Sequence, residues 1–361
     1  MTRRAADNNA KKRATTAAPD SPTTLEMVAR EAGVSIATVS RIINGTAKVS
    51  AERKDAVEAA IAKLNFRPNA AARGLALGKS HTIGVITQAI DSPFYGEGLR
   101  GIEDFLQQRG YTALFMSGNW NEADEERCMS ELLARRVDGI IIFSGRLDDR
   151  QLARYAKQVP IVVSGRNLQA PGIFSLQVDD EKGAALATRH LIELGHRHIA
   201  FIAGILDHPD ASLRFKGYRR ALVDAGIAHE PRLVVPGDFH EEGGVDATLR
   251  LLNSGASFTA LFCVNDQTAY GACLALHRRG LSCPRDVSVV GFDDLHSSTY
   301  RVPPLTSVRQ SIRVLGESSG AAMLQMLAGE QPSISLPPVE LIVRESTAAP
   351  PTLMINRLTR A

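Results

Sequence analysis

The sequence predicts a small all-α domain at the N-terminus, followed by an α/β body of two doubly wound parallel-sheet subdomains. Three observations predict this fold class. The chain of 361 residues is too long for one ordinary core. Short helical segments with a glycine turn fill residues 23–68. From Ile83 onward, eight short apolar segments alternate with amphipathic helices, the pattern of parallel sheets that carry helices on both faces.

The basic side chains are concentrated at the N-terminus. Residues 1–22 contain five basic and two acidic side chains, and we expect them to form a flexible basic tail. Residues 23–80 contain nine basic and five acidic side chains, so the remainder of the chain is net acidic although the whole carries +3. This asymmetry favours a polyanion as the partner of the first eighty residues, with a merely solvated basic face as the alternative.

Composition excludes several other classes of protein. No run approaches the ~18 apolar residues of a membrane span, and no apolar segment follows the first basic residues as it would in a secretory signal. The four cysteines form no C-x-x-C pair and have no histidine at metal-ligand spacing. We therefore expect reduced core thiols in a cytoplasmic protein, without a metal or another cofactor.

The N-terminal domain is predicted to contain three helices. Thr24 can cap the first helix and Ser35 the second, over residues 36–43, and the glycine between them makes the turn of a helix-turn-helix unit. A third helix opens at Ser50 and ends before Pro68, which gives the first two helices an apolar face to pack against.

The outside of the second helix carries residue types that bind DNA. Hydroxyl and guanidinium groups can bond phosphates or base edges, and the first residues of a recognition helix meet the major groove. A structural three-helix bundle is the alternative. The candidate residues are Ser35, Ile36, Ala37, Thr38, Ser40 and Arg41.

The segment TLEMVAREAGVSIATVSRIINGTAKVSAERKDAVEAAIAKLNFRPNAAARGLA resembles the headpiece of the lactose-repressor/galactose-repressor (LacI/GalR) family in motif order and spacing. The resemblance extends from Thr23 to about Ser346 and adds Thr24 and Asn44 to the DNA-binding residues. It implies a headpiece at 23–68, a hinge helix at 69–80, a two-lobed effector-binding and dimerisation domain of the periplasmic-binding-protein type at 81–346, and a C-terminal tail at 347–361.

The hinge segment NAAARGLALGKS would form a helix of about eight residues, which is marginal in water by itself. The resemblance implies that two copies become helical together in the minor groove at the operator centre. Leu75 then enters between base pairs as an apolar wedge, with Asn69 and Arg73 near the groove and backbone. A plain interdomain linker is the alternative.

Two headpiece positions depart from some members of the family. These members place polar base readers where this chain has Ile36 and Ala37. Direct readout then depends on Arg41 reaching O6 and N7 of guanine, and on apolar contact with a thymine methyl group.

One motif in the body is misleading. GEGLRG, residues 96–101, matches the G-x-G-x-x-G dinucleotide fingerprint, but eight residues separate it from the end of the preceding strand at Thr87. The fingerprint requires its first glycine directly after the strand. We therefore expect these glycines inside the first helix of the body and expect no nucleotide there.

Polar and aromatic side chains follow the predicted strands of the body. Ligands of parallel sheets bind beyond the carboxyl ends of the strands, and aromatic faces with Asp, Asn and Arg groups suit a polyhydroxylated ring. Helix capping and ordinary packing are the alternatives, and the two arginines leave a sugar acid or phosphate as open as a neutral sugar. The candidates are Asp91, Phe94, Tyr95, Arg166, His208, Asp210, Arg214, Asn265, Asp266 and Asp293.

The predicted function is a sequence-specific DNA-binding transcriptional regulator, most simply a repressor. Its affinity for a near-palindromic double-stranded operator would be controlled by a small-molecule effector, a sugar or sugar derivative, bound between the lobes. A homodimer is expected, because a twofold protein matches a palindromic site and the C-terminal segment has no apolar heptads. The alternatives are a solute-binding protein and a sugar-acting enzyme with an appended DNA-binding domain, although no catalytic motif is present.

Leu75→Ala should weaken binding to the operator more than binding to random DNA, because only the operator complex contains the inserted wedge. Competition between labelled operator and unlabelled random-sequence DNA measures the difference for the variant and the unchanged protein. An equal loss on both DNAs would contradict the wedge role.

Overall fold

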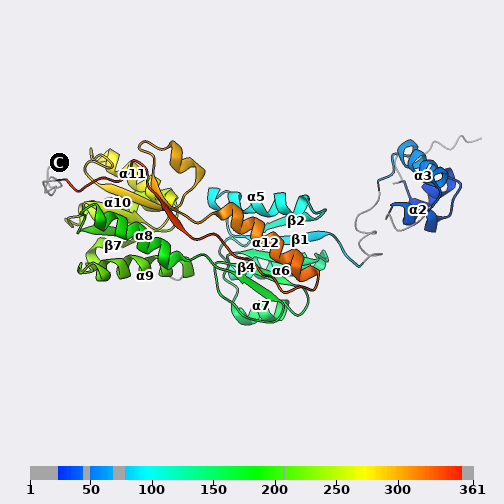
Figure 1. The fold of residues 1–361 in the computed structure, drawn as a ribbon, viewed down its shortest axis with the longest axis horizontal. Helices are drawn as coiled ribbons and strands as arrows, with labels where there is room; N and C mark the ends of the chain where they lie inside the picture. Colours follow the sequence, from blue (N-terminus) through cyan, green and yellow to red (C-terminus); the bar gives the residue numbers. More distant parts are fainter. Residues whose placement is uncertain (1–22, 44–48, 68–77, 206–207, 352–361) are drawn as a thin grey trace, which may run out of the picture. The chain divides into compact units, whose positions relative to one another are not determined.

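The computed structural model describes residues 23–43, 49–67, 78–205 and 208–351. The chain forms two compact units, which divide between Ser80 and His81 (Figure 1). Several predictions lie outside the described residues: the basic tail at 1–22, Asn44, and the hinge residues Asn69, Arg73 and Leu75.

The first unit contains the three predicted helices. The backbone N–H of Met27 donates to Oγ1 of Thr24 at 3.3 Å, and the N–H of Thr38 donates to Oγ of Ser35 at 3.2 Å, so both predicted caps are confirmed. Gly33 adopts φ +66° between the first two helices, a conformation that glycine adopts without strain. The helices are α1 (Leu25–Glu31), α2 (Ile36–Ile43) and α3 (Ala51–Lys63).

The second unit contains two lobes, each built on one sheet. The sheet of the first lobe has the order β2-β1-β3-β4-β5, and all of its strand pairs are parallel. Its strands are β1 (Thr82–Thr87), β2 (Thr112–Ser117), β3 (Gly139–Phe143), β4 (Ile161–Ser164) and β5 (Ile173–Leu176).

The sheet of the second lobe has the order β11-β10-β9-β8-β6-β7. Apart from the added edge strand β11, which pairs antiparallel with β10, its strands repeat the order of the first sheet. The strands are β6 (Ile199–Ala203), β7 (Val234–Pro236), β8 (Ala260–Cys263), β9 (Ser288–Asp293), β10 (Thr306–Arg309) and β11 (Glu340–Ile342).

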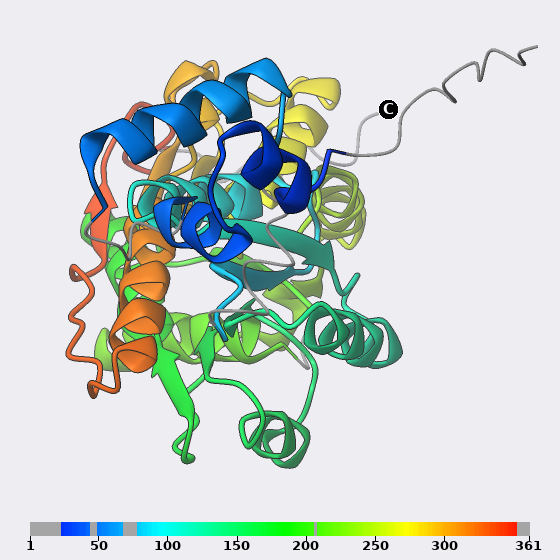
Figure 2. The ribbon, with the colours of Figure 1, turned by 90° about the vertical axis from the view of Figure 1, so that its right-hand side faces the viewer.

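Helices cover both faces of each sheet, as the alternating pattern predicts. In the first lobe, α5 (Pro93–Gln107) and α12 (Ile312–Leu327) cover one face, while α6 (Glu122–Ala134) and α7 (Asp149–Tyr155) cover the other (Figure 2). In the second lobe the pairs are α8 (Asp180–Glu193) with α9 (Pro209–Asp224), and α10 (Glu241–Asn253) with α11 (Asp266–Arg278). Within the described ranges, no helix combines the length and apolar character that crossing a bilayer requires.

The chain passes between the lobes three times (Figure 1). It leaves the first lobe after β5, where Val178 packs against the cores of both lobes. It returns after β10 to add α12 to the first lobe, and it crosses again so that β11 completes the second sheet. The first lobe is therefore assembled from two separate parts of the sequence.

All eight predicted strands are present, but three further strands escaped prediction. The segments of β5, β10 and β11 are IFSL, TSVR and ELI. They are three or four residues long, and each contains polar side chains at positions that the apolar pattern leaves unmarked.

The glycines of GEGLRG lie inside α5, as predicted, and two of them, Gly98 and Gly101, allow close packing. A Cβ atom on Gly101 would overlap the carbonyl oxygen of Arg313 in α12, and a Cβ on Gly316 would overlap the carbonyl of Gly98. The backbones of α5 and α12 are thus in direct contact. The same arrangement recurs in the second lobe, where a Cβ on Gly271 of α11 would overlap a backbone carbonyl of α10.

Gly101→Ala should lower the free energy of unfolding by about 1–3 kcal/mol, because two helix backbones must separate to admit the methyl group. Gly96→Ala is the matched control in the same helix, since a Cβ there meets nothing within 4 Å. It should be neutral or stabilising by up to about 1 kcal/mol. Urea unfolding followed by circular dichroism measures both variants, and equal stabilities would refute the packing role of Gly101.

Candidate functional site

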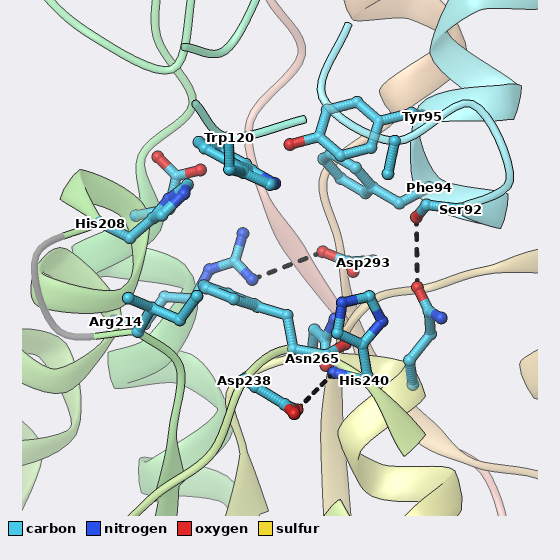
Figure 3. A pocket seen from close by; sticks show the side chains of 15 residues that line it. Ser92, Phe94, Tyr95, Trp120, His208, Arg214, Asp238, His240, Asn265 and Asp293 are labelled. Atoms are coloured by element: carbon cyan, nitrogen blue, oxygen red, sulfur yellow. Dashed lines mark hydrogen bonds and ion pairs between the residues drawn. The ribbon is translucent and has the colours of Figure 1, made fainter. Parts of the chain in front are cut away.

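A pocket lies between the two lobes, at the carboxyl ends of the strands (Figure 3). The first lobe contributes residues that follow β1 and β2, and the second contributes residues that follow or end β6, β7, β8 and β9. The lining residues are Ala89, Ser92, Phe94, Tyr95, Trp120, Ile205, His208, Asp210, Arg214, Asp238, Phe239, His240, Asn265, Gln267 and Asp293.

Aromatic rings form the first-lobe side of the pocket. The rings of Phe94 and Tyr95 meet edge to face with centroids 5.1 Å apart, and Trp120 lies 6.4 Å from Tyr95. Trp120 also contacts the second lobe, since its ring centroid is 3.6 Å from that of His208 at an interplanar angle of 70°. On the other side of His208 lies the Phe239 ring, at 5.3 Å. These rings offer apolar faces to a ligand.

Trp120 is held in place through its backbone. Asn119 and Trp120 adopt φ values of +51° and +54°, a conformation that is uncommon for residues other than glycine. The N–H of Trp120 donates to Oε1 of Gln88 at 2.9 Å, and Nε of Arg146 donates to the Trp120 carbonyl at 3.1 Å. The loop after β2 therefore presents the indole ring to the pocket in a fixed position.

A buried guanidinium lies at the base of the pocket. Arg214 is 3% exposed, and its Nε donates to Oδ1 of Asp180 at 2.8 Å while Nη1 donates to the carbonyl of Val264 at 2.8 Å. Nη1 also lies 3.6 Å from Oδ1 of Asp293, and the guanidinium stacks 3.8 Å from the centroid of Phe292. Arg214 thus connects α8, α9, β8 and β9.

Two carboxylates flank this guanidinium: Asp180 accepts a hydrogen bond from it, and Asp293 lies 3.6 Å from it. Burial raises the pKa of both Asp180 and Asp293, and the nearby charge of Arg214 opposes this effect in each case. Asp293 ends β9 with φ +112°, a strained value for a residue other than glycine, and its Oδ1 accepts a hydrogen bond from Nε2 of Gln310 at 2.5 Å. The backbone conformation directs this carboxylate toward the pocket.

Asp210 is a third carboxylate, in the first turn of α9. Burial raises its pKa to about 7, and the charge of Asp180 adds to the effect, while Arg214 and Arg166 oppose it. In the part of the chain that the structure describes, no group donates a hydrogen bond to Asp210 or forms an ion pair with it.

Amide side chains complete the second-lobe edge of the pocket. Asn265 caps α11 by accepting from the N–H of Thr268 at 2.9 Å, and its Nδ2 donates to the carbonyl of Phe239. Gln267 donates to Glu241 and accepts from Oγ of Ser92 at 3.3 Å, a hydrogen bond that joins the lobes. Carboxylates, amides and hydroxyls therefore surround a space that has aromatic walls.

Seven of the ten predicted effector residues line the pocket, and three do not. Asp91 is exposed outside it. Arg166 turns away, because its guanidinium donates to the carbonyls of Gly145 and Leu147 and pairs with Asp149 at 3.6 Å. The residues that line it are Phe94, Tyr95, His208, Asp210, Arg214, Asn265 and Asp293.

Asp266 is the third correction. It is fully buried below the pocket, where its carboxylate accepts from the N–H of Leu295 at 2.8 Å and from the hydroxyls of Ser298 and Ser307. Its role is to join α11 to the segment after β9 and to β10. Asp266 was predicted to contact the effector because it follows a strand end. Its carboxylate instead accepts hydrogen bonds within the second lobe.

Sequence reasoning missed several lining residues. Trp120 follows β2, and Asp238, Phe239 and His240 follow β7, so the rule that located the other candidates applies to them as well. Two further residues, Ser92 and Gln267, lie beside predicted ones. The lone tryptophan of the chain after a strand end was the strongest available indication.

The predicted DNA-binding residues of the first unit lie on the outer side of α2. Ser35, Ile36, Ala37 and Arg41 are exposed, and Ile36 retains 48% of its surface although it is apolar. Thr38 and Ser40 are partly exposed, and Thr24 is exposed while it caps α1. The hydroxyls of Ser35 and Thr38 share a hydrogen bond of 2.9 Å, which uses part of their bonding capacity.

Comparison with known proteins identifies the family. Residues 24–69 match the family model of bacterial regulatory proteins of the lacI family, and residues 188–347 match a periplasmic binding protein-like domain. The HTH-type transcriptional regulator GalR of Escherichia coli (strain K12) is 36% identical over 333 residues, which cover 91% of this chain and 97% of GalR. The chain belongs to the lacI family. This LacI-family protein is therefore a DNA-binding transcriptional regulator with an effector-binding domain, and not an enzyme, as the sequence predicted.

Solved structures of the family agree with the fold. The lac repressor dimer bound to operator and the anti-inducer ONPF is 35% identical, with a TM-score of 0.83 over 91% of this chain and all of that one. The complex of the transcriptional regulator CelR with cellobiose is 34% identical, with a TM-score of 0.67 over 90% of this chain and 99% of that one. The predicted fold class, a helix-turn-helix headpiece with a periplasmic-binding-protein-like body, is confirmed.

Asp210→Asn should stabilise the ligand-free protein more strongly at pH 8 than at pH 5. The folded state holds the Asp210 proton up to about pH 7, whereas the unfolded chain loses it near the ordinary pKa of 3.8, so this group costs stability as the pH rises between these values. The amide removes that cost. Thermal unfolding should show a gain in Tm about 5 °C larger at pH 8 than at pH 5.

The exposed Asp91, replaced by Asn, is the control for this measurement and should give the same Tm difference at both pH values. A pH-independent effect of Asp210→Asn would mean that its carboxyl group titrates normally.

Proposed function

We propose that this LacI-family protein is a homodimeric repressor that works in the cytoplasm and binds a near-palindromic operator. A small-molecule effector, a sugar or sugar derivative, binds in the pocket between the lobes and controls operator affinity. The observation that carries the proposal is the pocket itself, in which aromatic rings of one lobe face a buried Arg–Asp network of the other, in a chain that begins with a DNA-binding headpiece.

The operator part of the proposal is supported by the exposed face of α2. Arg41 is exposed on this face and would read a guanine edge, while the exposed Ile36 and Ala37 give this helix an apolar end that suits thymine methyl groups. The related lac repressor dimer is bound to its operator in a solved structure. Two copies of this headpiece would each read one half-site.

The dimer part is supported by exposed apolar side chains on the second lobe. Leu274 on α11 is 43% exposed, and Tyr300 and Val302 are 72% and 98% exposed. The segment that carries the last two packs on α11, since Tyr270 hydrogen-bonds to Ser297 and Ser298. Large apolar side chains left exposed on a helix and on the segment that packs on it indicate an interaction site, and we assign these residues to contacts with the second subunit.

The effector part is supported by the chemistry of the pocket. Rings such as Trp120 and Phe94 can stack on the apolar face of a sugar, while Asp, Asn and Gln side chains can bond its hydroxyl groups. CelR, a relative of 34% identity, is known in complex with cellobiose. A sugar or sugar derivative is therefore the ligand class that we propose.

The position of the pocket explains how effector binding would be coupled to operator binding. Because the ligand contacts both lobes, it changes their relative orientation, and this movement reaches the segment that connects the body to the headpiece. The two hinge segments of a dimer then separate or pack together. Such coupling is reciprocal, so operator DNA must change effector affinity by the same factor as effector changes operator affinity.

The test begins with a thermal-shift screen of neutral sugars, sugar acids, sugar phosphates and nucleobases. A ligand at a hundred times its Kd should stabilise the fold by ~2.7 kcal/mol. Trp120 is the only tryptophan of the chain and lines the pocket, so its fluorescence should report the same binding events. The operator is obtained by selection from random-sequence DNA, and its affinity is then measured with and without the ligand.

Arg41→Ala is the control variant for the DNA half. It should retain the fluorescence response to the ligand and lose about 1–3 kcal/mol of discrimination at one base pair. A ligand that binds without changing operator affinity would contradict the proposal and favour a simple binding module. Turnover of the bound ligand would favour an enzyme.

A further inference from the structure

Two of the four cysteines lie next to each other near the surface of the second lobe. Cys273 is on α11, and Cys283 follows the turn that ends this helix. In that turn Gly280 adopts φ +70° and the N–H of Leu281 donates to the carbonyl of Leu276 at 3.0 Å, so the chain folds back along α11. Both cysteines pack against the same apolar core, and their thiols interact through a hydrogen bond.

The exposure of this pair differs from that of the other two cysteines. Cys128 and Cys263 are 1% and 0% exposed, as expected for core thiols, and burial raises the pKa of both. Cys273 and Cys283 are each partly exposed. A thiol reacts with a dissolved oxidant when solvent reaches it and when it ionises readily, so reactivity is expected at this pair.

The hydrogen bonds give the two thiols different roles. Cys283 has a single S–H group, which can donate to the carbonyl of Ser346, at 3.4 Å, or to the sulfur of Cys273. Donation to an ionised Cys273 stabilises the thiolate and lowers the pKa of Cys273, although burial opposes this effect. The same contact raises the pKa of Cys283, because the pair shares the remaining proton. Cys273 therefore ionises first.

A cation lies near the Cys273 thiol. The guanidinium of Arg301 stacks 3.7 Å from the ring centroid of Tyr270, which lies one turn before Cys273 on α11. Its positive charge lowers the pKa of Cys273 further. A partly exposed thiolate with a cation and a second thiol beside it is the arrangement that makes a cysteine sensitive to peroxide.

We propose that Cys273 and Cys283 form a redox-active pair, which hydrogen peroxide converts reversibly into a disulfide within one subunit. The Cys273 thiolate attacks the peroxide, its sulfur gains an O–H group as the O–O bond breaks, and the leaving hydroxide takes up a proton to become water. The Cys283 sulfur then attacks the sulfur of this sulfenic acid, and the S–O bond breaks as the S–S bond forms. The Cys283 proton leaves in a second water, so the two thiols pass two electrons to one peroxide.

The pair is independent of the effector pocket, and the proposal does not rest on the proposed function. Neither cysteine lines that pocket. Cys273 precedes Leu274, one of the residues that we assign to contacts with the second subunit. The disulfide also removes the S–H group that binds the carbonyl of Ser346. Oxidation therefore changes hydrogen bonding to the C-terminal segment beside the assigned subunit contact.

Peptide mapping of the full-length protein tests the disulfide directly. The reduced protein is treated with hydrogen peroxide, its remaining thiols are blocked with iodoacetamide, and its tryptic peptides are identified by mass spectrometry. Trypsin places Cys273 in residues 251–278 and Cys283 in residues 280–285. We expect these peptides to appear joined, without the two thiol hydrogen atoms, and to separate after treatment with dithiothreitol. Because residues 251–278 also contain Cys263, the Cys263→Ala variant should give the same cross-link.

Substitution of each cysteine separates the two roles. Cys283→Ser removes the thiol that resolves the sulfenic acid, so this acid should persist on Cys273 and be trapped by dimedone. Cys273→Ser should abolish the cross-link and slow the oxidation of Cys283 by at least about tenfold. Cys128→Ala, a core substitution in the other lobe, should give the cross-link of the unchanged protein. Circular dichroism checks that each variant is folded.

The contribution of the cation is tested separately. Arg301→Gln should slow the oxidation of Cys273 at neutral pH, because less of the thiol is ionised. Arg301→Lys keeps the charge and should retain most of the rate. The rate of alkylation by iodoacetamide as a function of pH gives the pKa of Cys273 in each variant.

Three results would overturn the assignment. They are the absence of the cross-link in the unchanged protein, a disulfide between two subunits in place of this one, and no dimedone adduct on Cys273 in the Cys283→Ser variant. Non-reducing electrophoresis detects the second result, because a cross-link between subunits doubles the apparent mass of the chain.

Discussion

The second lobe depends on one buried guanidinium. Arg214 binds the start of α8 through Asp180 and the end of β8 through the carbonyl of Val264, and it lies beside Asp293 at the end of β9. A charge in this position is stable only while its partners remain close, because removing either side leaves an unpaired ion in the protein interior. Four segments that are far apart in sequence are thereby fixed in one place. The base of the pocket is consequently formed before any ligand arrives.

Most of the fold could be predicted from the sequence, because most of the buried strands are continuous apolar runs. The pattern does not show which helix packs on which sheet. Nothing near α12 in the sequence indicates that this helix covers the first sheet. For the site, the strand-end rule selected Arg214 and Asp293, and both of these residues line the pocket. Arg166 and Asp266 do not line the pocket. Arg166 binds backbone carbonyls, which residue types do not reveal, and Asp266 binds hydroxyl and N–H groups of segments that are distant from it in the sequence.

The two sides of the pocket have different chemistry. The first lobe supplies most of the aromatic surface, to which the second lobe adds the rings of Phe239 and His208, and the second lobe supplies the charged and amide groups. The rings of Trp120 and His208 already touch across the cleft, and Ser92 donates to Gln267 nearby. The lobes are thus in contact with each other around the pocket, and a ligand has to fit between surfaces that also interact directly.

The threefold passage of the chain between the lobes has a consequence for protein synthesis. The strands of the first lobe leave the ribosome early, but Ile312 and Leu315 of α12 pack against Ile83 and Val85, and α12 begins 136 residues after β5, the last of these strands, ends at Leu176. At ~5–20 residues per second this interval is about 7–30 s, during which apolar sheet surface stays uncovered. The second sheet is completed later in synthesis, by β11. The nascent chain therefore exposes apolar sheet surface for part of its synthesis and is a natural client for chaperones that shield such surface.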